Sequence, residues 1–180
     1  MKFSTLTILL LCLLPILCGC DKDKGTMIWD FTPQHFEIKV VDEAGNNLLE
    51  PTTDGAWNVE DIIANYKDTD YQCTVVNNPL SEPMTDEITR ELPAYMRGLR
   101  TAQAGNDRVL FFGDFSPANN YKQIPLILKW PDGSQSTFTF DCYIIWHSED
   151  NPEVVTKLYH EGKEMEMTET KFGKQVTIRK

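Results

Sequence analysis

The sequence predicts an all-β domain, an antiparallel β-sandwich, because short alternating segments follow one another without helical crossovers. The clearest pair is residues 124–130 and 136–146, in which apolar and polar side chains alternate. Between them lies the turn sequence Pro131-Asp132-Gly133, so the two segments are expected to form a hairpin. An immunoglobulin-like Greek key is the preferred topology, and a transthyretin-like sandwich is the alternative.

The first strand is predicted over residues 34–41, where side chains of opposite character alternate. One face carries Phe36, Ile38 and Val40, and the other carries His35, Glu37 and Lys39. The apolar face should pack in the core, and the polar face should meet solvent.

The segments that follow are less regular. Residues 57–66 fit both a short helix and a strand, whereas residues 70–76 alternate again and place Cys73 inward. Residues 77–107 contain several prolines and little periodicity, which predicts a long irregular insertion. Loops of this length in a compact domain are usually functional or mobile.

From residue 108 onward the β signal is strong. Residues 109–115 are almost continuously apolar, which indicates a buried strand. Residues 154–160 and 163–168 are expected to form a second hairpin, and residues 175–179 form the last predicted strand.

The N-terminus has the features of a bacterial export signal. Lys2 precedes an apolar run at residues 6–17. A membrane-spanning helix needs roughly 20 apolar residues, so a signal peptide is favoured over an anchor helix. The run ends at residues 17–20, Leu-Cys-Gly-Cys, which resembles the lipobox of bacterial lipoproteins. In such proteins the cysteine thiol receives a diacylglycerol and becomes the mature N-terminus.

This pattern divides the chain into three parts. Residues 1–19 are predicted to be a lipoprotein signal peptide, residues 20–28 a lipidated N-terminus and tether, and residues 29–180 a single β domain. Cys20 is the predicted lipidation site. The charged residues 21–24 loosely resemble the surface-export signal of Bacteroidota lipoproteins. The expected location is therefore the outer membrane, with exposure at the cell surface.

The chain is acidic and of single-domain length. It has 180 residues, with 27 Asp and Glu against 17 Lys and Arg, and a net charge of −10. This length suffices for one domain with a proper core. The negative charge argues against binding nucleic acid or anionic membranes through charge, so membrane attachment is expected through the lipid.

Several motifs recur in an order that resembles a group of small, uncharacterised Bacteroidota lipoproteins. The resemblance implies a single exported β domain and supplies no catalytic or binding residues. Its motifs are the lipobox, Asp30-Phe31-x-Pro33, the alternating pattern of residues 36–49, Phe112-Gly113, and Ile127-x-x-Trp130-Pro131-Asp132-Gly133.

Two cysteines remain for the domain once the leader and the lipid site are set aside. These are Cys73 and Cys142. An exported compartment permits a disulfide, and both side chains are predicted to face the core. A bridge and a pair of buried thiols therefore both stay open, and neither cysteine has the surroundings of an activated thiolate.

No motif predicts a catalytic or metal centre. His35, His147 and His160 are far apart in sequence and lack a zinc-type spacing, so they are expected to be surface histidines, with no metal and no cofactor. The nucleophile motif Gly-x-Ser-x-Gly does not occur. The protein is not expected to be an enzyme.

Aromatic side chains are the remaining candidates for binding. Trp130 and Trp146 occupy positions in phase with the core and are predicted to pack there. Trp29 and Trp57 lie outside the predicted strands and are the candidate ligand-facing aromatics.

The sequence thus favours a non-catalytic, lipid-anchored envelope protein that acts as a surface or periplasmic binding module. Its expected partner is a glycan or an envelope protein, and not nucleic acid. The alternative is a structural subunit of an envelope assembly that pairs through an exposed sheet edge.

Overall fold

The computed structural model describes residues 29–76 and 98–180. The predictions for residues 1–28, including lipidation of Cys20, lie outside the described residues. Residues 77–97 of the predicted insertion also lie outside them. The β domain is the compact unit Phe31–Lys180.

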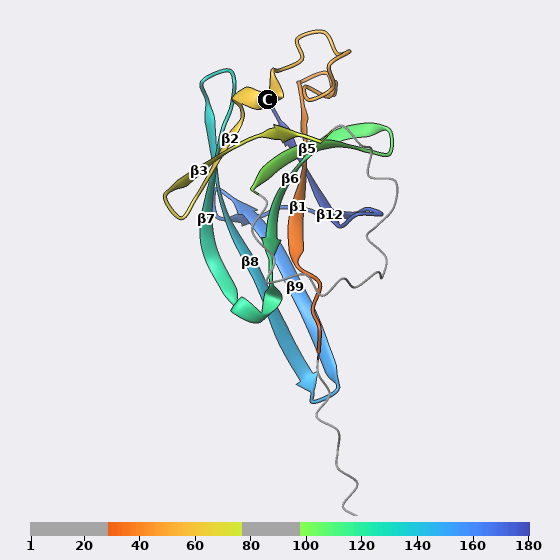
Figure 1. Cartoon of the computed structure of the whole chain (residues 1–180), viewed down its shortest axis with the longest axis vertical. Helices are drawn as coiled ribbons and strands as arrows, with labels where there is room; N and C mark the ends of the chain where they lie inside the picture. Colours follow the sequence, from red (N-terminus) through yellow and green to blue (C-terminus); the bar gives the residue numbers. More distant parts are fainter. Residues whose placement is uncertain (1–28, 77–97) are drawn as a thin grey trace, which may run out of the picture. The chain divides into compact units, whose positions relative to one another are not determined.

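Two six-stranded sheets pack face to face as a sandwich, as predicted (Figure 1). The first sheet has the order β11-β12-β1-β6-β5-β4, and the second has the order β10-β9-β8-β7-β2-β3. The strands of the first sheet are β1 (Gln34–Val41), β4 (Thr74–Val75), β5 (Leu99–Ala104), β6 (Asp107–Phe115), β11 (Thr168–Glu169) and β12 (Lys174–Arg179). Those of the second sheet are β2 (Ile63–Tyr66), β3 (Thr69–Gln72), β7 (Tyr121–Lys129), β8 (Gln135–Ser148), β9 (Asn151–His160) and β10 (Lys163–Glu164).

The strand order contains the Greek-key core of the immunoglobulin fold. Strands β1-β6-β5 have the order of immunoglobulin strands B-E-D, and β8-β7-β2-β3 have the order G-F-C-C′. Every neighbouring pair in these two groups is antiparallel. The difference lies beside β1, where the immunoglobulin fold places its first strand. Here the C-terminal strand β12 takes that place and runs parallel to β1.

An aromatic cluster fills the centre of the sandwich. Phe115 is 2% exposed, and its ring lies 4.4 Å from that of Phe140 on the opposite sheet, measured between centroids. Gly113 lies against the same ring. A Cβ atom at Gly113 would come within 2.6 Å of Phe115, and its φ of +129° also favours glycine. The other rings in contact with Phe115 are those of Phe36, Tyr66, Phe112 and Tyr121.

The predicted hairpin around Pro131-Asp132-Gly133 is confirmed as β7 and β8. Trp130 is 3% exposed, as predicted, and its indole Nε1 donates a 2.9 Å hydrogen bond to the hydroxyl of Ser136. The buried indole N–H is therefore satisfied within the hairpin itself.

The ambiguous residues 57–66 divide into a 3-10 turn, Val59–Asp61, and strand β2. The strand predicted at residues 70–76 is also divided, because β3 belongs to the second sheet and β4 to the first. The chain crosses between the sheets at Cys73, whose backbone N–H donates to the carbonyl of Ile62.

The predicted irregular insertion was wrong at its C-terminal end. Within residues 98–107, β5 forms a regular strand that pairs with β6 from Leu99↔Phe112 to Ala104↔Asp107. Its sequence, Leu-Arg-Thr-Ala-Gln-Ala, has no clear alternation of apolar and polar side chains, so the strand is recognised by its pairing with β6 and not by its local pattern. The turn dipeptide Gly105-Asn106 was the available signal.

The second predicted hairpin is shorter than expected. Strand β9 pairs with β10 over two residues only, and β11 pairs with β12 in the other sheet. Residues 163–168 therefore cross from one sheet to the other. The last strand is confirmed as β12, with Val176 and Ile178 buried.

Candidate binding surface

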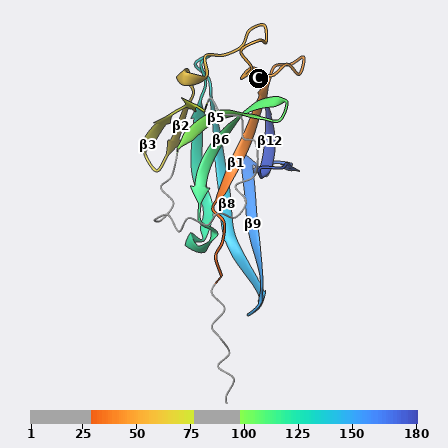
Figure 2. The same cartoon turned by 45° about the vertical axis from the view of Figure 1, so that its right-hand side comes forward.

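The hairpin of β8 and β9 continues past the end of the sandwich, which is visible in two views (Figure 1 and Figure 2). Strand β7 pairs with β8 only as far as Tyr121↔Cys142. Beyond that point, residues 143–148 of β8 and residues 151–155 of β9 pair with each other and with no other strand that the structure describes. We call these two segments the projecting ribbon.

Large apolar side chains are exposed on the projecting ribbon. Trp146 is 50% exposed and Ile145 is 38% exposed. The prediction that Trp146 packs in the core was wrong. Trp146 lies on the same face of β8 as the buried Phe138 and Phe140, but the opposite sheet does not extend far enough to cover it. Alternation defines the face on which a side chain lies, and it does not say whether another layer covers that face.

The ribbon lies at the end of the domain where the chain enters. Phe31, the first residue of the compact unit, packs edge-on against Trp146, with ring centroids 6.0 Å apart. Such edge-to-face pairs stabilise the arrangement beyond the area they bury. The start of the domain and the exposed tryptophan are therefore held together.

The apex of the ribbon is acidic. Glu149 and Asp150 form its turn, and the Ser148 hydroxyl donates a 2.6 Å hydrogen bond to Asp150. His147 is exposed, as predicted, and its Nε2 lies 2.7 Å from a carboxylate oxygen of Glu153 across the ribbon. The surface thus combines an apolar middle with an acidic tip.

A buried carboxylate fixes the base of the ribbon. Asp141 is 8% exposed and accepts hydrogen bonds from the backbone N–H of Gln123 at 2.7 Å and from the Tyr159 hydroxyl at 3.0 Å. Desolvation and the hydrogen bond to Asp141 raise the pKa of Tyr159. This network ties β7, β8 and β9 together at the point where the register between β7 and β8 shifts.

The other candidate aromatic residues differ in exposure. Trp57 is half-buried and packs against Trp130, with ring centroids 5.6 Å apart, so it belongs to the edge of the core. This corrects the interpretation of Trp57 as ligand-facing. Trp29 is 37% exposed and precedes the compact unit.

The polar face predicted for β1 is not solvent-exposed at its centre. Glu37 is fully buried, and the Thr170 hydroxyl lies 2.9 Å from each of its carboxylate oxygens. His35 is half-buried beside it, with Nε2 3.7 Å from Glu37 Oε1, so the prediction of a surface histidine was wrong there. The turn that carries Thr170 comes from far along the chain, which is why local alternation did not predict this burial.

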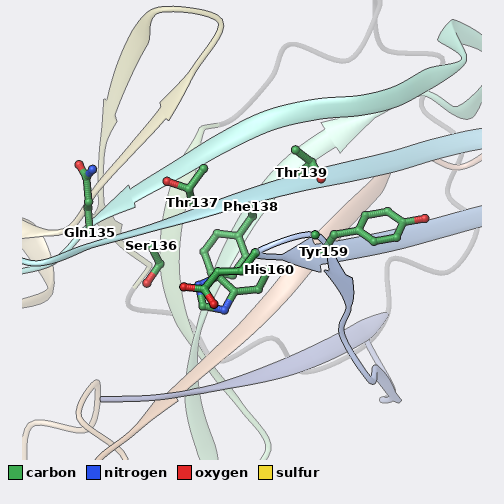
Figure 3. A pocket seen from close by; sticks show the side chains of 9 residues that line it. Gln135, Ser136, Thr137, Phe138, Thr139, Tyr159 and His160 are labelled. Carbon is green, nitrogen blue, oxygen red and sulfur yellow. The ribbon is translucent and has the colours of Figure 1, made fainter.

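The third histidine lines an open recess (Figure 3). His160 packs on Phe138 with ring centroids 4.9 Å apart, so it too differs from a freely exposed surface histidine. The recess forms where β9 ends at His160 while β8 continues to Gln135. The residues that line it are Gln135, Ser136, Thr137, Phe138, Thr139, Tyr159, His160, Glu161 and Gly162.

Both cysteines of the domain are free thiols in the core. The disulfide left open by the sequence is not formed. The two sulfur atoms contact different carbonyls, Cys142 that of Phe115 and Cys73 that of Thr74. Burial raises the pKa of Cys73 to about 12 and that of Cys142 to about 11.

These thiols should not react with iodoacetamide at pH 8.5 while the protein is folded, and both should react once it is unfolded in guanidinium. In the unfolded chain a thiol ionises near pH 9, whereas both folded-state pKa values lie higher. Their contribution to stability is therefore full below about pH 9 and is lost as the pH rises through the folded values. Mass spectrometry of labelled protein checks the first point. Rapid labelling of either native thiol would contradict it.

Within residues 29–76 and 98–180, no three His, Cys, Asp or Glu side chains gather in a group that could hold a metal ion. In the same residues, no helix has the length and apolar character needed to cross a membrane.

Comparison with known proteins found no matching family model, curated protein or solved structure.

Proposed function

We propose that this protein is a non-catalytic, lipid-anchored module of the bacterial cell envelope that binds an envelope protein through the projecting ribbon. The observation that carries the proposal is the exposure of Trp146, with Ile145 exposed on the opposite face, on a ribbon that extends beyond the sandwich. Tryptophan is among the residues most enriched at binding hot spots, because it offers a large apolar surface and an N–H donor.

Aliphatic neighbours favour a protein partner over a glycan. Ile144 and Val154 are half-buried, pair with each other across the ribbon, and lie on the same face as Trp146 because alternate residues share a face. A glycan would stack on flat aromatic faces, whereas a mixed tryptophan and aliphatic surface suits burial against apolar side chains.

The proposed anchor places this surface near a membrane. Ten residues separate Cys20 from Phe31, and they can span at most about 35 Å when fully extended. Because Phe31 contacts Trp146, the ribbon lies at the tethered end of the domain. The partner is therefore proposed to be a protein located at or close to the anchoring membrane, in an outer-membrane setting.

A photo-crosslinking amino acid at position 145, in the full-length protein in its native membranes, tests this proposal. We expect a discrete protein adduct, whose yield falls about tenfold or more when Trp146→Ala is added, because removal of a hot-spot side chain costs about 2 kcal/mol or more. Immunoblotting and mass spectrometry of the adduct provide the measurement.

Trp57→Ala is the control, because Trp57 is a half-buried tryptophan that packs against Trp130 outside the ribbon. It should leave the yield unchanged. An adduct that is insensitive to Trp146→Ala, or one that glycosidases remove, would contradict a protein partner bound at the ribbon.

A second candidate function is a subunit of an envelope assembly. A specific observation supports it, because no strand in the described part of the chain pairs with the outer edge of β9 from residue 151 to residue 157.

A further inference from the structure

Among residues 29–76 and 98–180, the outer edge of β9 is unpaired between defined limits, and we call this stretch the open edge. On one side β9 pairs with β8 along its whole length. On the other side β10 covers Tyr159 and His160, and the N–H of Met165 donates a 2.8 Å hydrogen bond to the carbonyl of Leu158. From residue 151 to residue 157, no strand in the described part of the chain pairs with this edge.

The directions of the backbone groups follow from these contacts. The Leu158 carbonyl points away from β8, toward Met165. Alternate residues of a strand direct their N–H and C=O groups to the same side. The register between β8 and β9 shifts only between Trp146 and Ser148 on β8, so β9 itself is regular. Thr156, Val154 and Pro152 therefore also direct their backbone groups toward the open edge.

This edge carries a short and bounded set of hydrogen-bonding groups. Val154 and Thr156 each direct an N–H and a C=O to this side, where no described strand pairs with them. Pro152 has no N–H to donate, so the ladder of hydrogen bonds ends there in the direction of the ribbon's tip. Met165 already occupies the place beside Leu158, which ends the ladder in the other direction. The open window is centred on Val155.

We propose that a second copy of this chain adds to the open edge, antiparallel, about a two-fold axis at Val155. In this register Val154 of one copy lies opposite Thr156 of the other, and each such pair exchanges two backbone hydrogen bonds. The two Val155 side chains meet at the axis as a non-hydrogen-bonded pair, in which side chains approach closely. The second sheets of the two copies become one continuous sheet, an isologous contact.

Charge selects this register over its neighbours. With the axis at Val155, Glu153 of each copy lies opposite Lys157 of the other, on the same face of the sheet as Val155. With the axis at Val154, Glu153 would lie opposite Val155. With the axis at Glu153, two carboxylates would face each other, which is destabilising.

The charges contribute specificity rather than strength. Glu153 already lies 2.7 Å from His147, and Lys157 lies 2.9 Å from Glu164 in the same chain. All four side chains are substantially exposed, where ion pairs contribute little. The backbone ladder and the Val155 contact therefore carry the pairing.

The contact is short, so the affinity in dilute solution should be low. In this register Pro152 of one copy would face Leu158 of the other, where Met165 already lies. Each ribbon must therefore bend away beyond residue 153, and the strong twist of two-stranded ribbons allows this. Anchoring many copies on one membrane raises their effective concentration and favours pairing. This last step rests on the proposed lipid anchor, whereas the register of the pairing does not.

Cysteine crosslinking of the full-length protein in its native membranes tests the register. Val155→Cys should give a disulfide-linked dimer on mild oxidation, because the two cysteines would meet at the axis at a separation compatible with a disulfide. Glu153→Cys and Lys157→Cys alone should not, because each would lie roughly 13 Å from its own copy at about 3.3 Å per residue. Glu153→Cys mixed with Lys157→Cys on a differently tagged chain should give the heterodimer. Non-reducing electrophoresis measures all four.

A charge exchange gives a second readout in the Val155→Cys background. Glu153→Lys should lower the dimer yield several-fold, and addition of Lys157→Glu should restore it. Absence of a Val155→Cys dimer in protein shown to be folded by its protease resistance would overturn the proposal. Equal dimer yields from all three single cysteine variants would also overturn it, because they would indicate random collision.

The outcomes are separable from those of the proposed function. Trp146→Ala removes the ribbon contact with the partner protein and leaves the β9 edge intact, so it should not change the Val155→Cys dimer yield. Loss of the photo-adduct with retention of the dimer supports both proposals. Loss of the dimer with retention of the photo-adduct overturns self-association alone.

Discussion

Replacing Cys20 by alanine should move the protein from the membrane fraction to the soluble fraction almost completely. Each buried methylene of an acyl chain contributes about 0.8 kcal/mol, and two or more chains give stable anchoring where one gives only marginal binding. Removal of the attachment site removes all of this at once. Ultracentrifugation of lysed cells and incorporation of labelled palmitate are the two measurements.

Cys18→Ala is the matched control for this experiment. Cys18 lies two residues away in the same motif, and it is expected to leave with the signal peptide. The Cys18→Ala variant should remain lipidated and sediment with membranes. Continued sedimentation of Cys20→Ala without palmitate label would contradict the proposed anchor and would point to attachment through the folded domain.

Replacing Phe115 by alanine should lower the free energy of unfolding by about 3–5 kcal/mol, the usual range for truncating a buried phenylalanine. The ring is 2% exposed and lies 4.4 Å, between centroids, from Phe140 on the facing sheet, so the variant leaves a cavity where the two sheets meet. For a domain of this size the corresponding fall in Tm is about 10 °C. Denaturant unfolding followed by tryptophan fluorescence provides the measurement.

Ile145→Ala should change the same free energy by no more than about 0.5 kcal/mol, because Ile145 is 38% exposed on the projecting ribbon. The contrast distinguishes the core of the sandwich from its proposed binding surface. A loss below about 1 kcal/mol for Phe115→Ala would show that Phe115 does not hold the two sheets together.

The ribbon and the β9 edge share residues 151–155, whereas the proposed anchor lies before the domain. Phe31, the first residue of the compact domain, lies beside Trp146 on the ribbon. Asp141 holds the base of the ribbon to β7 and β9 through Gln123 and Tyr159. A partner bound at Trp146 and a second copy bound along Val155 would therefore contact the same hairpin.

Local patterns predicted the elements whose partners are close in sequence. The alternation of residues 34–41 predicted β1 to the residue, and the Pro131-Asp132-Gly133 turn predicted the β7–β8 hairpin. Both signals are local, because alternation follows from strand geometry and the turn from backbone preferences. The core positions of Phe36, Ile38 and Val40 followed from the same alternation.

The candidate surface depended on information that no local pattern contains. Trp146 has the same phase as Phe138, yet Phe138 is 1% exposed and Trp146 is 50% exposed. Glu37 has the phase of a solvent-facing residue, yet Thr170, 133 positions away in sequence, covers it. In each case the sequence showed on which face of the strand the side chain lies, but it did not show whether another part of the chain covers that face.

The sequence by itself determined the all-β class, the phase of the strands and the proposed site of lipidation at Cys20, because periodicity and short motifs are local properties of a chain. Only the tertiary structure decided which sheet each strand joins, where the opposite sheet ends and which edge stays open. Those features depend on contacts between distant segments, such as Met165 beside Leu158 and Phe31 beside Trp146. The exposed ribbon and the open β9 edge are both consequences of where these long-range contacts stop.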